Sequence, residues 1–99
     1  MVPAWACKKD GNQDVIVEAL EALGLTVIDA HSFAQYHAGL SDLMVFYGGD
    51  FSFVEVKEIG ENLNDNEKAF RRWCLSNAIK FTVIDSIEQA IVWGEGFRK

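Results

Sequence analysis

Two carboxylates and a lysine that could hold a metal ion and activate water lie on neighbouring apolar segments of the chain. Asp42 begins the first segment, and Glu55 and Lys57 lie near the end of the second. Only Gly48 and Gly49 separate the segments, and such a pair predicts a β-hairpin, because a type I′ turn needs positive φ at both central residues. We therefore expect an antiparallel pair of strands.

The turn fixes which residues face each other across the hairpin. With the glycine pair as its loop, Met44 faces Phe53 and Asp42 faces Glu55, and side-chain alternation places Lys57 on the same face. Directly opposed like charges destabilise a sheet. A divalent cation would compensate, because two carboxylates, water and a phosphate oxygen form a typical Mg²⁺ site. Lys57 would then orient, or help to deprotonate, a water that attacks a phosphodiester.

The same cluster also has a purely structural interpretation. Asp42 and Glu55 would be strand-end residues that reach solvent, and Lys57 would neutralise both in a surface salt bridge. The surrounding sequence favours chemistry, since polar residues within otherwise apolar strands are costly and therefore informative.

Helical patterns precede and follow the hairpin. Apolar residues at helical spacing predict a first helix over residues 13–23. Asn64 and Glu67 have capping-box form and predict the start of a second helix. Its inward face is expected to contain Phe70, Trp73 and Cys74. A second capping-box pattern over residues 86–89 predicts a short last helix that ends near Trp93.

β-rich segments over residues 25–30 and 80–85 complete the order α-β-β-β-α-β-α. Strands that are apolar on both faces, with helices between them, imply a sheet covered on both sides, which is a three-layer α/β fold. The 99 residues contain no linker and no repeat. We therefore expect a single domain over residues 1–99 with its core at about residues 8–93.

Charge and cysteine content narrow the class of protein. The formal net charge of −6 excludes a simple basic DNA-coating protein, but not a nuclease whose carboxylates hold metal ions. The two cysteines are far apart and show neither disulfide nor zinc-site spacing, which is typical of a reducing compartment. No secretory signal and no apolar run of about 20 residues is present, so we expect a soluble, cytoplasmic protein.

These segments resemble the PD-(D/E)XK nuclease superfamily, in particular its small phage-type VRR-nuclease members related to Holliday-junction resolvases. The resemblance is carried by residues 39–45 and 53–57, together with residues 9–13, 63–67 and 86–90. It covers nearly the whole chain. The resemblance implies a restriction-endonuclease-like fold, in which a mixed β-sheet with an αβββαβ core is flanked by helices.

The same resemblance implies a Mg²⁺-dependent DNA endonuclease, in which Mn²⁺ can substitute, with branched or recombination-type DNA as its substrate. Carried over by position, it makes Asp42 and Glu55 metal ligands together with the carbonyl oxygen of Val56, and it makes Lys57 the catalytic lysine. It further implies a homodimer in members that cut branched DNA, and the host cytoplasm as the location of phage-encoded members.

At two positions the sequence fits the motif of this family less closely. Gln13 stands where many relatives have a glutamate or glutamine on the first helix, and Glu18 is the other candidate for this active-site group. Ser41 stands where the motif has a proline. Because that proline only presets the backbone ahead of Asp42, its loss affects local geometry more than chemistry.

Basic residues could contact a DNA backbone. Lys68, Arg71 and Arg72 follow the i, i+3, i+4 spacing of a single helix face. The alternative is a solvated face in which Glu67 pairs with Arg71. Two further candidates precede the first helix: Lys8 and Lys9.

Other functions and an oligomeric state also follow from the sequence. The alternatives to a DNA endonuclease are a catalytically inactive module of the same fold, which binds DNA or a protein partner, and an RNA-directed nuclease. Aromatic residues near the termini either complete the core or form a subunit interface. The interface is favoured, because a small acidic domain needs a second copy to bind a two-fold symmetric junction. These residues are Trp5, Trp93 and Phe97.

Overall fold

The computed structural model describes residues 12–30, 37 and 39–99. The elements are α1 (Gln13–Ala22), β1 (Thr26–Asp29), β2 (Leu43–Tyr47), β3 (Asp50–Val56), α2 (Asp65–Ser76), β4 (Lys80–Ile84) and α3 (Ile87–Phe97). The predicted order of elements is confirmed in these residues, and α1 and the strands match their predicted ranges to within one residue. The predictions for Trp5, Lys8 and Lys9 lie outside the described residues.

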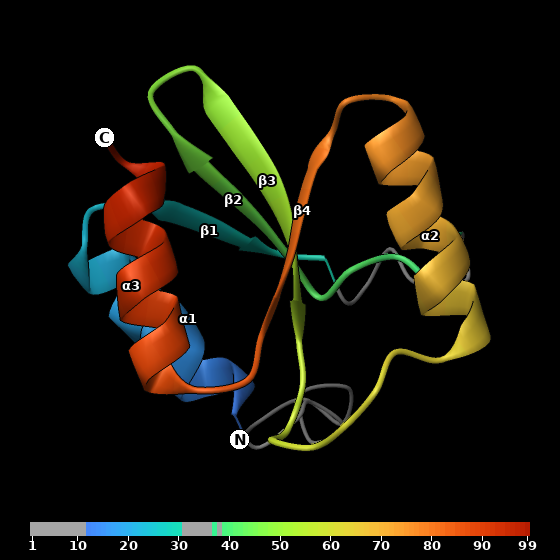
Figure 1. Cartoon of the computed structure of the whole chain (residues 1–99). Coiled ribbons are helices and arrows are strands. Elements are labelled where there is room, and N and C mark those ends of the chain that lie inside the picture. The colour runs from blue at the N-terminus through green and yellow to red at the C-terminus, as the bar shows by residue number, and fades with distance from the viewer. Residues whose placement is uncertain (1–11, 31–36, 38) are drawn as a thin grey trace.

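The four strands form one mixed sheet in the order β1-β2-β3-β4. The first three strands are antiparallel neighbours, and β4 pairs with β3 in parallel. Figure 1 shows α1 and α3 together on one side of the sheet and α2 on the other. The predicted α/β class is thus confirmed, with helices on both faces of the sheet.

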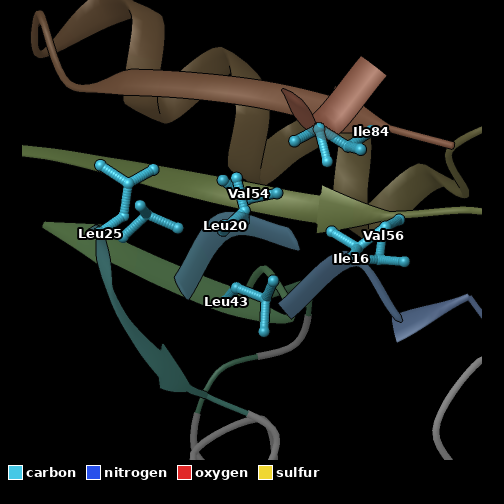
Figure 2. Packing of buried hydrophobic residues seen from close by; sticks show 9 residues of the cluster. Ile16, Leu20, Leu25, Leu43, Val54, Val56 and Ile84 are labelled. Atoms are coloured by element: carbon cyan, nitrogen blue, oxygen red, sulfur yellow. The ribbon is translucent and has the colours of Figure 1, made fainter. Parts of the chain in front are cut away.

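The main core lies between the sheet and the pair α1 and α3. Alternate residues of β2 and β3 point into it, and Figure 2 shows how they meet the apolar side chains of α1 and β4. The buried members are Ile16, Leu20, Leu25, Leu43, Val45, Val54, Val56, Ile84 and Ala90. Because these positions take one face of β2 and β3, the intervening residues, Glu55 among them, lie on the face toward α2.

The hairpin has the predicted register but a different turn. Met44 pairs with Phe53, and Tyr47 pairs with Asp50. Of the two turn residues, Gly48 has a positive φ of 60°, whereas Gly49 does not. The prediction of a type I′ turn is therefore wrong, and the arrangement is that of a type II′ turn, which needs positive φ only at its first central position. Both turns close a two-residue loop, so the register is unchanged.

The inward face of α2 is narrower than predicted. Phe70 and Cys74 are buried, but Trp73 is 51% exposed. The helix contacts the sheet through Phe70, whose ring meets that of Phe53 at 5.0 Å. The indole of Trp73 stacks on Phe70 at 5.7 Å and covers it from the solvent side. The assignment of Trp73 to the core is therefore wrong.

The last helix, α3, continues to Phe97 rather than ending near Trp93. Gly94 lies within the helix and allows it to pack closely, since a Cβ there would lie 2.7 Å from Cδ1 of Leu23, which follows α1. Trp93 and Phe97 stack at 4.8 Å and pack partly buried against the core. None of the helices among the described residues combines the length and apolarity that a membrane crossing needs.

Candidate active site

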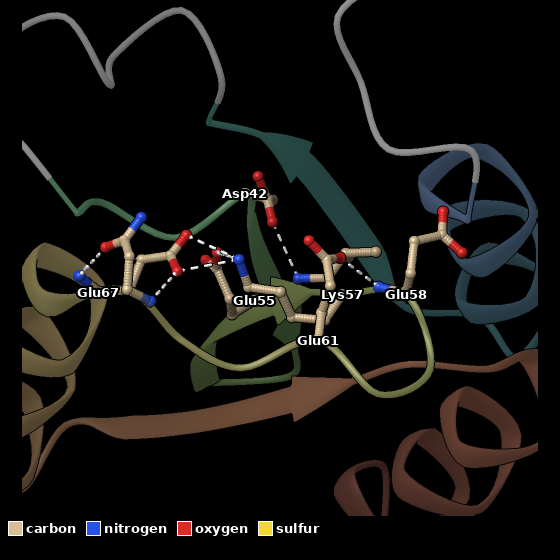
Figure 3. A network of polar contacts seen from close by, with 8 residues as sticks. Asp42, Glu55, Lys57, Glu58, Glu61 and Glu67 are labelled. Atoms are coloured by element: carbon tan, nitrogen blue, oxygen red, sulfur yellow. Dashed lines mark hydrogen bonds and ion pairs between the residues drawn. The ribbon is translucent and has the colours of Figure 1, made fainter.

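The predicted carboxylates meet where β2 begins and β3 ends (Figure 3). Asp42 directly precedes β2, and its Oδ2 accepts a hydrogen bond of 2.9 Å from the backbone N–H of Val56. Its own carbonyl oxygen accepts from the N–H of Ala30 at 2.8 Å, which continues the pairing of β1 with β2. Asp42 is thus held from both neighbouring strands, with its carboxylate directed toward β3.

Glu55 has the most deeply buried ionisable side chain of the cluster. Glu55 is 2% exposed, and its Oε2 is buried with no hydrogen-bond partner among the described residues. Burial, a hydrogen bond with the carboxyl group of Glu67 and the charge of Asp42 raise the pKa of Glu55 to about 10. Two carboxyl groups can hydrogen-bond only if one carries a proton. Without a cation, Glu55 is therefore protonated at neutral pH.

Lys57 stays charged despite its limited exposure. Burial alone would lower its pKa, but the hydrogen bond and charge of Glu67, with the charge of Glu55, raise the pKa of Lys57 above its ordinary value. Its Nζ lies 2.9 Å from Glu67 Oε1 and 3.1 Å from Oε2, compared with 3.8 Å from Glu55 Oε1. An ammonium group therefore lies beside the two glutamates.

Glu67 is the member of the cluster that sequence reasoning missed. Its predicted capping box with Asn64 is confirmed, with both hydrogen bonds at 2.8 Å. Burial would raise the pKa of Glu67, but hydrogen bonds from Glu55, from the N–H of Asn64 and from Lys57 lower it. The capping pattern gave a sufficient local reason for this glutamate, so nothing in the sequence alone pointed to its contact with Lys57.

The chemistry of the cluster fits a hard cation. Asp42, Glu55 and Glu67 offer three carboxyl groups against one ammonium, and one buried carboxylate oxygen lacks a partner among the described residues. Such an oxygen is costly to leave unsatisfied, and carboxylate oxygens are what Mg²⁺ prefers. Among the residues with described side chains, no three His, Cys, Asp or Glu converge as a metal-ligand group. The predicted set is smaller, two side chains and the Val56 carbonyl, and leaves room for water and phosphate.

The start of α1 is tied to the same end of the sheet. Asn12 donates from Nδ2 to the carbonyl oxygens of Lys57, at 3.0 Å, and Asp85, at 2.6 Å. Gln13 is buried and donates from Nε2 to Asp29 Oδ2 at 3.3 Å. Glu18 is exposed on the outer face of α1. The predicted role of Gln13 at the metal site stays a prediction.

The predicted basic stripe lies on the surface of α2. Lys68, Arg71 and Arg72 are exposed and line one hollow of about 510 Å³ with Leu75 and residues 62–63. Among the described residues none of the three forms an ion pair, and Glu67 pairs with Lys57 instead of Arg71. The alternative of a Glu67–Arg71 pair is therefore wrong. The three cations follow Glu67 along α2 and have no acidic partner among the described residues.

The segment that leads to Asp42 passes very close to the first turn of α2. Gly39 has φ of +85°, and a Cβ there would lie 2.2 Å from the carbonyl oxygen of Asn66. Only glycine combines this φ with this approach to backbone. Gly39 therefore allows the segment that leads to Asp42 to pass against the first turn of α2, which contains Glu67. Ser41, which replaces the expected proline, is buried, and within the described residues its hydroxyl has no hydrogen-bond partner.

Replacing Gly39 with alanine should destabilise the protein far more than the same change at Gly24. Gly24 has a similar φ, +89°, but a Cβ there would meet nothing within 4 Å. Gly24→Ala should therefore lower the free energy of unfolding by about 1 kcal/mol, and Gly39→Ala by about 3 kcal/mol or more. Urea unfolding followed by circular dichroism measures both, and equal losses would contradict the close approach.

Comparison with protein-family models, with curated proteins and with solved structures finds no match for this chain.

Proposed function

We propose that this chain is a Mg²⁺-dependent DNA endonuclease with the restriction-endonuclease-like fold of the PD-(D/E)XK superfamily, and that its substrate is branched or recombination-type DNA. The observation that carries the proposal is the buried Glu55 carboxylate, whose Oε2 lacks a hydrogen-bond partner within the described residues. Asp42 and the Lys57 ammonium lie beside it. A buried excess of carboxylates has no structural benefit, but it does serve to bind a cation.

The donor set gives each residue a role. Asp42, Glu55 and the carbonyl oxygen of Val56 would hold Mg²⁺, or Mn²⁺ in its place, and Gln13 would support the site from α1. A bound Mg²⁺ supplies positive charge that polarises a phosphodiester and makes a water easier to deprotonate.

Other groups of the chain would orient the ligands, the attacking water and the DNA. Asp42 is fixed before any ligand arrives, because the Val56 N–H already binds one of its oxygens. The Lys57 ammonium adds a fixed positive charge that can orient the attacking water and stabilise charge that develops on the phosphate. Lys68, Arg71 and Arg72 would bind the DNA backbone beside the site, with Lys8 and Lys9. A homodimer would present two such sites to a two-fold symmetric junction.

The proposal is tested by a cleavage panel of linear, nicked, flapped and four-way DNA and a matched RNA, in Mg²⁺ and in EDTA. We expect Mg²⁺-dependent cleavage that is strongest on branched DNA and is lost in Asp42→Asn. If the chain cleaves the RNA faster than any DNA, the proposed DNA substrate is wrong and the chain is an RNA-directed nuclease. Binding of DNA without cleavage of any panel member would favour the catalytically inactive module.

The basic stripe makes a separate prediction about salt dependence. Replacing Lys68, Arg71 and Arg72 together with glutamine should weaken DNA binding and lower the slope of log K against log salt by about 2 to 3, because each lost phosphate contact removes about 0.9. A fluorescence-anisotropy titration at several salt concentrations measures the slope.

A second triple variant controls for net charge. Lys80 begins β4, and Arg98 and Lys99 follow the end of α3, so none of the three belongs to the stripe on α2. Their replacement with glutamine removes the same three charges, and the salt slope should stay close to the wild-type value. Equal slopes in the two triple variants would mean that the stripe on α2 does not contact DNA.

A further inference from the structure

The nearest anion to the Lys57 ammonium among the described residues is not a predicted metal ligand but Glu67. Both carboxylate oxygens of Glu67 lie within hydrogen-bond distance of Lys57 Nζ, at 2.9 and 3.1 Å, while Glu55 lies at 3.8 Å. The side chains of Lys57 and Glu67 are only 12% and 14% exposed. Water therefore competes weakly for this ion pair, and the pair fixes where the ammonium lies.

Glu67 is itself held by the backbone of α2. Its Oε1 accepts from the N–H of Asn64 at 2.8 Å, and its own N–H donates to Asn64 Oδ1 at 2.8 Å. The carboxylate also lies in the first helical turn, where the helix dipole favours negative charge. The Lys57 ammonium is therefore held by a carboxylate that is itself fixed at the start of α2.

A lysine needs such a support more than most catalytic groups. Its four-carbon stem has about 2 kcal/mol of rotamer entropy, and misplacement of a reacting group by about 1 Å can reduce a rate by about a hundredfold. Without Glu67, the ion pair left to Lys57 among the described residues would be the longer one to Glu55, which the cation would also occupy. We propose that Glu67 is a positioning residue that holds the Lys57 ammonium at the candidate active site, an inference that rests on the proposed function.

The capping box offers a competing explanation, in which Glu67 only stabilises α2. Two variants separate the explanations. Glu67→Gln keeps an oxygen that can accept from the Asn64 N–H, as glutamine does in natural capping boxes, but it removes the charge that holds Lys57. Asn64→Ala removes the side-chain half of the box, but it leaves the backbone N–H that binds Glu67 and leaves the ion pair intact.

The experiment measures cleavage kinetics, thermal unfolding and the rate at which acetic anhydride labels Lys57, read by peptide mass spectrometry in the metal-free protein. We expect Glu67→Gln to lower kcat at least about tenfold with KM within about twofold and to label Lys57 several times faster. It should also unfold at a lower temperature, because Lys57 loses its partner in a largely buried ion pair. Asn64→Ala should keep the wild-type kcat and labelling rate but unfold about 4 to 8 °C lower.

Three results would overturn the inference, and they are distinguishable. If the wild-type chain cleaves DNA and Glu67→Gln has the same kcat or the same Lys57 labelling rate, the positioning role fails while the proposed function stands. If the wild-type chain cleaves no member of the panel, the proposed function fails and the positioning role fails with it. A kcat that falls equally in Glu67→Gln and Asn64→Ala would assign Glu67 to the capping box alone.

Discussion

Replacing Glu55 with glutamine is expected to stabilise the metal-free protein while abolishing Mg²⁺-dependent cleavage. The raised pKa of Glu55, about 10 compared with an ordinary 4.5, means that the folded chain resists ionisation of this group. The preference of the folded state for protonated Glu55 therefore contributes to the free energy of unfolding. This contribution is fully present below about pH 4.5 and is lost as the pH rises toward 10. Glutamine has nothing to ionise and can donate a hydrogen bond to a neighbouring carboxylate.

The stability gain should therefore grow with pH. In EDTA we expect Glu55→Gln to exceed the wild type by about 1 to 3 kcal/mol near pH 8 and by less near pH 5. Urea unfolding at both pH values measures the difference. At Mg²⁺ concentrations about a hundred times the dissociation constant the wild type should gain about 2.7 kcal/mol and the variant nothing. A variant that is less stable than the wild type at pH 8 in EDTA would contradict the account of Glu55.

Removing the Lys57 ammonium should cause the largest loss of activity among changes that leave the metal ligands in place. We expect Lys57→Met to lower kcat by about 10² to 10³, the usual effect of losing one group that stabilises a transition state. It should also destabilise the fold, because Glu67 then loses its partner in a largely buried ion pair. Cleavage of the best panel substrate, with circular dichroism to establish folding, measures both effects.

An arginine at the same position is the matched control. Lys57→Arg keeps the positive charge beside Glu67 and should therefore keep the fold. A guanidinium is larger, planar and not interchangeable with an ammonium, so kcat should still fall at least about tenfold. A folded Lys57→Met protein that cleaves at the wild-type rate would remove Lys57 from the mechanism.

The hairpin shows how far sequence reasoning reaches when local rules decide. A two-residue loop fixes the register whichever turn type closes it, so the facing of Met44 and Phe53 is confirmed although the turn itself differs. The same register brings Asp42 to β3, where it meets the Val56 N–H. The capping box of α2 is likewise local, and it too is confirmed.

The parts that sequence reasoning missed depend on tertiary packing. Glu67 satisfies a local helix rule and a distant lysine at once, and only the first is visible in the sequence. Trp73 follows the helical spacing of buried residues, but the side of α2 that meets the sheet is filled by Phe70. The sequence predicts a last helix that ends near Trp93, but the helix continues to Phe97 because Gly94 allows it to pack closely against leucine side chains at and after the end of α1.

The central claim, that Glu55 is a ligand to a divalent cation, is tested most directly by calorimetric titration of the metal-free protein with Mg²⁺ and with Mn²⁺. Glu55 must lose its proton to bind, so at neutral pH the wild type should bind the ion and release about one proton, measured by repeating the titration in buffers of different ionisation enthalpy. Glu55→Gln should show neither binding nor proton release. Equal binding by the wild type and Glu55→Gln, or no binding by the wild type, would contradict the claim.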